Sequence, residues 1–175
     1  MKYYLITDGS ACFEDDTAPH DKNGLVGLGA AWVVATYRGH KILSLSQRTI
    51  DIVHTGIDLK NVEHAKRAYL LAEMVALTDG LNALPPGSTV ALRSGCKQLM
   101  PTIQSRQIPK LRAKNRFLEP YYAGLIEALG RHTIERAKPE DGQQFSLWVD
   151  RTARNAARGP WNLPDFVTQT PKRAP

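Results

Sequence analysis

The sequence predicts an α/β protein in which a mixed sheet is flanked by helices. Three strand-like runs come first along the chain, and a long helical pattern follows between residues 61 and 84. A short strand, two helical segments, a further strand and a last helix complete the order. Strands and helices in this order are typical of a sheet that carries helices on its faces.

The first three strands indicate an antiparallel start to the sheet. Residues 2–8 form an apolar run, which we expect to be a buried strand that ends at Asp8 with a turn at Gly9. A polar and acidic loop is expected next. Residues 27–37 and 41–49 are expected to form two further strands joined by a short turn.

Helix periodicity and stop residues predict the remaining elements. Asn61 is a typical N-cap for the first helix, and the sequence Pro85-Pro86-Gly87 ends it. The elements expected after it are a strand at 89–93, helices near 96–104 and 119–129, a strand at 132–137 and a helix at 143–158.

The length of 175 residues suits one domain with a core of its own. We expect this domain to cover residues 1–158, and the four prolines of residues 159–175 indicate an irregular C-terminal tail. No apolar run reaches the length of a membrane span. Two cysteines are too few for a disulfide framework, and the N-terminus lacks the pattern of a secretory leader. These features favour a cytoplasmic protein.

The net charge of +6 is concentrated in one stretch of the chain. No acidic residue lies between Asp79 and Glu119. The basic residues there are Arg93, Lys97, Arg106, Lys110, Arg112, Lys114 and Arg116. This basic stretch can be an ordinary solvated face, but such faces usually mix both signs of charge, and a field of one sign attracts polyanions. The distribution therefore favours nucleic acid as a partner.

Three carboxylates lie at unusual positions. Asp8 closes an apolar strand, where it can also serve only as a turn former. Glu73 lies on the apolar face of the first helix, so it needs a cation, strong donors or a place at the edge of that face. Asp150 borders the apolar stripe of the last helix, where it can also be a surface charge favoured by the helix dipole. Each position has an ordinary structural explanation when it is taken alone.

Together, in this order and in these contexts, the three acids resemble the type 1 ribonuclease H family. The likeness begins with ITDGS at the end of the first strand, the glycine-rich run GLGAAWVV and LAEMVALTDGL in the first helix. The segments ALGRHTIE and WVDRTARNAA resemble the family's last strand and last helix. It covers the chain from Tyr3 to about Ala157 and places Asp8, Glu73 and Asp150 at three of the family's catalytic carboxylates.

The resemblance implies a ribonuclease H-like fold with a five-stranded mixed sheet, so that residues 1–158 would form a ribonuclease H-like domain. It also implies hydrolysis of the RNA strand of RNA–DNA hybrids with divalent cations, Mg²⁺ or Mn²⁺, held by hard oxygen ligands. Asp8, Glu73 and Asp150 would then be catalytic residues and metal ligands. The residues of the basic stretch would bind the nucleic acid.

One of the family's four carboxylates, the third in chain order, is missing from this chain. Members have an Asp directly after the fourth strand, where TVALRSGCKQL aligns Gly95, or Ser94 after a shift of one residue. The Thr-Asn-Asn that touches the minor groove of the hybrid is here Ala68-Tyr69-Leu70, and the loop before the last helix contains no His. An engineered replacement of Gly95 would leave these other departures unexplained.

Two classes of function therefore stay open. One is a ribonuclease H-type nuclease of weak or atypical activity, because a missing ligand lowers the affinity for at least one cation. The other is a non-catalytic module that keeps the fold to bind nucleic acid or another protein. We expect Asp8, Glu73 and Asp150 to converge beside the basic stretch, and Gly95 to lie within a side chain's reach of Asp8.

Overall fold

The sheet has five strands in the order β3-β2-β1-β4-β5. The computed structural model describes residues 1–13, 24–38, 41–96, 99–104, 116–138 and 142–159. The strands are β1 (Lys2–Phe13), β2 (Leu25–Thr36), β3 (Ile42–Ile50), β4 (Thr89–Ser94) and β5 (Thr133–Arg136). β1 is central because it pairs antiparallel with β2 on one side and parallel with β4 on the other. The predicted class, a five-stranded mixed sheet flanked by helices, is confirmed.

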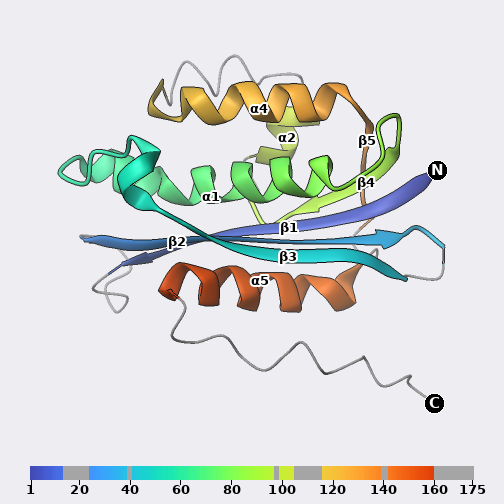
Figure 1. Cartoon of the computed structure of the whole chain (residues 1–175), viewed down its shortest axis with the longest axis horizontal. Coiled ribbons are helices and arrows are strands. Elements are labelled where there is room, and N and C mark those ends of the chain that lie inside the picture. The colour runs from blue at the N-terminus through green and yellow to red at the C-terminus, as the bar shows by residue number, and fades with distance from the viewer. Residues whose placement is uncertain (14–23, 39–40, 97–98, 105–115, 139–141, 160–175) are drawn as a thin grey trace.

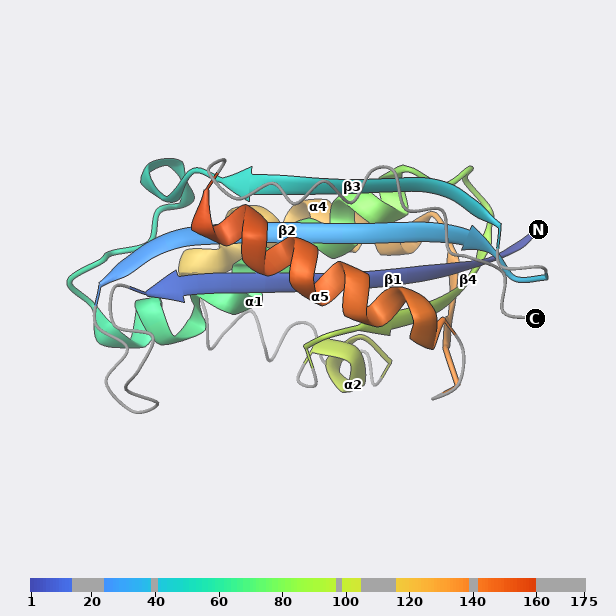
Figure 2. The same cartoon turned by 90° about the horizontal axis from the view of Figure 1, so that it is seen from below.

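Helices cover both faces of this sheet (Figure 1). One face carries α1 (Val62–Asn82), α2 (Leu99–Gln104) and α4 (Glu119–Gly130), and the other carries α5 (Gln143–Arg158). Two short 3-10 helices, η1 (Ile52–Thr55) and η2 (Arg116–Leu118), lie in the connections. Seen from below, α5 crosses β1 and β2 diagonally (Figure 2). Within the described residues, no helix has the length and apolar character needed to cross a lipid bilayer.

The sheet separates two hydrophobic cores. Leu5 packs into the larger core under α1 and α4, whereas the next residue, Ile6, packs into the smaller core under α5. Successive side chains of a strand point to opposite faces. Because both faces of the sheet are covered, β1 is apolar at consecutive positions and shows no alternation.

Most predicted boundaries agree with the structure to within a few residues. Asn61 caps α1 as expected, since its side chain accepts hydrogen bonds from the amides of Glu63, at 3.0 Å, and His64, at 3.4 Å. The last helix has the predicted bounds and begins after Gly142, whose φ of 66° lies in the left-handed region. Apart from Gly159, the expected tail lies outside the described residues.

The predicted end of the first strand is wrong. β1 does not turn at Gly9 but runs on to Phe13, paired with β2 from Gly9 opposite Ala30 as far as Cys12 opposite Gly27 before the register shifts. A Cβ at position 9 would lie only 2.2 Å from the amide nitrogen of Glu73. Gly9 is therefore needed because α1 packs directly on the strand. This close approach brings the backbone of Glu73 next to Asp8.

Candidate active site

Asp8 lies at the point where β1 loses one of its neighbours. The last pair between β1 and β4 joins Thr7 to Ser94, while pairing with β2 continues through Asp8 and beyond. Asp8 therefore has no partner on β4, although it is still paired with β2. The carboxyl ends of neighbouring parallel strands are a common place for catalytic groups.

Glu73 is a buried acid with a defined partner. Its side chain comes from α1 and is 1% exposed. The Ser94 hydroxyl donates a hydrogen bond of 3.0 Å to Glu73 Oε2 and accepts one of 3.2 Å from the Cys96 amide. Ser94 thereby fixes the orientation of Glu73, a role that the sequence did not reveal.

Asp8 connects the other two acids. Its carboxyl group is within hydrogen-bonding reach of both Glu73 and Asp150. The expected convergence of the three side chains is therefore found, with Asp8 in the middle. We call Asp8, Glu73 and Asp150 the acid cluster.

Burial and like charges raise the pKa values of Asp8 and Glu73. Burial, together with the nearby charge of Asp150, raises the pKa of Asp8 to about 6, although Glu73 and the Gly9 amide act in the opposite direction. Burial and the charge of Asp8 raise the pKa of Glu73 well above its usual range. Crowded carboxylates of this kind are common at functional sites, and a bound cation relieves their repulsion.

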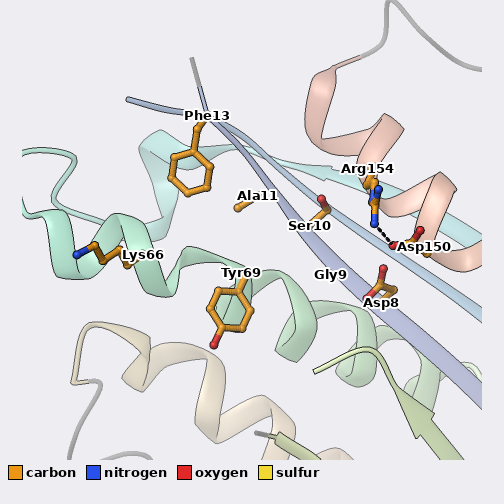
Figure 3. A pocket seen from close by; sticks show the side chains of 9 residues that line it. All are labelled: Asp8, Gly9, Ser10, Ala11, Phe13, Lys66, Tyr69, Asp150 and Arg154. Carbon is orange, nitrogen blue, oxygen red and sulfur yellow. Dashed lines mark ion pairs between the residues drawn. The ribbon is translucent and has the colours of Figure 1, made fainter. Parts of the chain in front are cut away.

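Arg154 is a cation beside the cluster that sequence reasoning missed. It is one helical turn beyond Asp150 on α5, and the two side chains form an ion pair of 3.0 Å (Figure 3). The i,i+4 spacing was the signal that could have identified this pair. Both side chains are substantially exposed, so the pair is weak and readily exchanged.

Gly95 faces the acid cluster directly. A Cβ built on it would lie 1.9 Å from Asp8 Oδ1 and 2.9 Å from Glu73 Oε1. The expectation that position 95 is within a side chain's reach of Asp8 is confirmed. A side chain at position 95 would therefore meet the carboxyl group of Asp8.

The chemistry of the cluster fits a hard divalent cation, because its donors are carboxylate oxygens. Within the described residues, however, no group of three or more His, Cys, Asp and Glu side chains is arranged to hold a metal ion. The acids meet as pairs through Asp8, and a ligand from position 95 is lacking. The assignment of Asp8, Glu73 and Asp150 as catalytic residues and metal ligands stays a prediction.

Only two residues of the basic stretch belong to the described part of the chain. Arg93 is half-buried on β4 opposite Ile6, and Arg116 is exposed at the start of η2. The others lie outside the described residues: Lys97, Arg106, Lys110, Arg112 and Lys114. A basic surface beside the acid cluster therefore stays a prediction.

A pocket of about 220 Å³ begins at Asp8 and Asp150. It follows the part of β1 that continues beyond the end of β4. We call it the β1 pocket. Its floor is formed by Gly9, Ser10 and Ala11, and its walls come from α1 and α5 (Figure 3). The pocket exists because β1 does not end at Asp8.

Solved structures with ribonuclease H domains share this fold. A foamy viral protease-reverse transcriptase in complex with an RNA/DNA hybrid matches 88% of this chain at 12% identity, with a TM-score of 0.58. The chain spans only 20% of that protein's length. LC9-RNase H1, a type 1 RNase H with the type 2 active-site motif, matches 90% of this chain and 72% of its own at 11% identity and a TM-score of 0.57.

A third likeness covers nearly the whole of a small domain. The N-terminal RNase H domain of a Mycobacterium tuberculosis protein, solved as a fusion with maltose binding protein, matches 87% of this chain and 92% of its own at 15% identity and a TM-score of 0.51. No protein-family model and no curated protein sequence matches the chain. At these identities the likenesses establish the fold, which is ribonuclease H-like.

Proposed function

We propose that this protein is a ribonuclease H-type hydrolase that depends on a divalent metal ion and cleaves the RNA strand of RNA–DNA hybrids weakly. The observation that carries the proposal is the convergence of Asp8, Glu73 and Asp150 on a ribonuclease H-like fold, at the place where β4 ends. The burial of Glu73 beside a second carboxylate destabilises the folded protein. A catalytic role gives a reason why this carboxylate is retained.

Each residue of the cluster has a distinct part in the proposed activity. Mg²⁺ or Mn²⁺, when bound, would supply an activated water and neutralise charge on the scissile phosphate. Asp8 contacts both other acids and is the central ligand. Ser94 holds Glu73 in place, and Asp150 is free to bind a cation once Arg154 releases it.

The proposed partner is an RNA–DNA hybrid. Two observations support a nucleic acid: the single-sign basic stretch of the sequence, and the likeness to a protein solved in complex with an RNA/DNA hybrid. Arg93 and Arg116 are the described members of that stretch. Contacts to phosphates would make the affinity fall with rising salt concentration.

A non-catalytic binding module is the second candidate function. The observation that favours it is the site itself, since Gly95 supplies no ligand and Arg154 already neutralises part of the charge of Asp150. Such a module would bind a duplex, or a protein partner, and leave the RNA intact.

A cleavage assay with RNA-labelled hybrid distinguishes the two functions. We expect slow cleavage that is detectable mainly in Mn²⁺, because Mn²⁺ tolerates a missing ligand better than Mg²⁺, which demands near-ideal octahedral geometry. Asp8→Asn and Glu73→Gln should abolish this cleavage. Asp58→Asn changes an exposed carboxylate outside the acid cluster and should leave the cleavage unchanged.

Hybrid that is bound but never cleaved would contradict the enzyme and support the module. Fast cleavage in Mg²⁺ would show that another acid completes the site. Asp79 is then the described residue to test first, although it forms an ion pair of 3.3 Å with Arg48. Asp15 and Asp16 lie outside the described residues.

A further inference from the structure

The β1 pocket offers more than the acid cluster requires. Asp8 and Asp150 line one end of it, but it continues along β1 as far as Phe13. The floor of Gly9, Ser10 and Ala11 carries only small side chains, so a ligand can approach the strand backbone closely. The pocket has room for a phosphate and its sugar beside the acids.

Two cations stand on different walls of this pocket. Lys66 comes from α1 and Arg154 from α5. Both cations form weak ion pairs in the structure. Lys66 is 3.7 Å from Glu63, and Arg154 pairs with a partly exposed Asp150. A phosphate that enters the pocket beside Asp150 therefore displaces only a weak partner of Arg154.

Tyr69 gives the pocket an aromatic wall. Its neighbours Ala68 and Leu70 are buried at 0% and 3% exposure, so Tyr69 is the residue of this triplet that reaches the pocket. In the ribonuclease H family, which this chain resembles, side-chain amides at these positions touch the minor groove of a paired hybrid. This chain has the aromatic ring of Tyr69 there instead. An aromatic ring binds a base by stacking, which an unpaired base allows.

We propose that the β1 pocket binds one unpaired nucleotide of the substrate strand beside the acid cluster. Its phosphate lies against Arg154, at the end of the pocket that holds Asp8 and Asp150, and its base packs against Tyr69. This inference rests on the proposed function and specifies its substrate class, a hybrid that continues into a single-stranded overhang. Arg154 then moves from Asp150 to the phosphate, which frees Asp150.

Binding without cleavage tests the pocket. Fluorescence anisotropy in EDTA would compare a blunt hybrid, the same hybrid with a three-nucleotide overhang, and a version whose overhang is abasic. We expect the overhang to tighten binding about tenfold, and the abasic overhang to lose that gain, because stacking on an aromatic ring supplies it. Tyr69→Ala should abolish the gain, and Tyr69→Phe should keep it.

The cation contact has a separate readout in the salt dependence. Arg154→Gln should weaken binding of the overhang hybrid and lower the slope of log affinity against log salt by about one phosphate contact. Arg151→Gln is the matched control, since Arg151 is an exposed residue of the same helix outside the pocket.

The outcomes separate this inference from the proposed function. Equal affinity for all three hybrids, unchanged by Tyr69→Ala, would overturn the nucleotide pocket and leave the nuclease proposal standing. Failure to bind any hybrid at low salt would overturn the proposed function as well.

Discussion

Gly95→Asp is expected to raise the rate of RNA cleavage in Mg²⁺ by orders of magnitude. The substitution supplies the missing carboxylate at a position that faces both Asp8 and Glu73. A further hard ligand strengthens cation binding, and the cation carries most of the catalytic charge stabilisation. Initial rates on a labelled hybrid, with Mg²⁺ varied, would measure the gain.

The structure also defines the control for this substitution. A Cβ at position 95 would meet Asp8 Oδ1 at 1.9 Å, so the side chain of Asp8 must rotate to accommodate it. Gly95→Ala introduces the same crowding without a ligand and should give no gain. If Gly95→Asp is no more active than Gly95→Ala, the missing ligand does not limit the activity, and the module becomes the better account.

Asp8→Asn should stabilise the fold at neutral pH while it abolishes cleavage. Burial and Asp150 raise the pKa of Asp8 from 3.8 to about 6 in the folded state. A raised pKa means that protonation stabilises the folded protein, and this contribution is lost as the pH rises through 6. Removing the charge should therefore increase the free energy of unfolding at pH 7.5 by about 2–3 kcal/mol.

The pH profile of stability tests the same point independently. In EDTA, the free energy of unfolding of the wild type should fall by about 2 kcal/mol between pH 4 and pH 7 on account of Asp8. Urea titrations should show a smaller fall for Asp8→Asn. Asp58→Asn, which changes an exposed carboxylate, should follow the wild-type profile. If Asp8→Asn is less stable than the wild type at pH 7.5, the negative charge of Asp8 does not destabilise the folded protein.

The sequence predicted the elements well because strong local signals mark them. Asn61 and the prolines after Leu84 define α1, and the apolar run of β1 shows a strand covered on both faces. Carboxylates in apolar contexts are rare, which singled out the three acids. Their convergence was expected from the resemblance of their order and contexts to the ribonuclease H family. The expected position of Gly95 near Asp8 came from the same resemblance, which implied that the strand before Gly95 pairs with the first strand.

The remaining features depend on tertiary contacts. Gly9 looks like a turn residue in the sequence, but it is glycine because α1 packs against it, and the β1 pocket follows from that difference. The hydrogen bond from Ser94 to Glu73 joins residues that are far apart in sequence, so no local pattern could show it. The i,i+4 spacing of Asp150 and Arg154 is visible in the sequence. Only the structure shows that this ion pair lies beside Asp8.

The proposed nuclease requires that Asp8, Glu73 and Asp150 still hold a divalent cation without a ligand from position 95. A titration of Mn²⁺, with the free ion followed by electron paramagnetic resonance, measures this directly in wild type and in Asp8→Asn. We expect a Mn²⁺ site in the wild type that Asp8→Asn removes. Wild type that binds no Mn²⁺, or binding that Asp8→Asn leaves unchanged, would contradict this expectation.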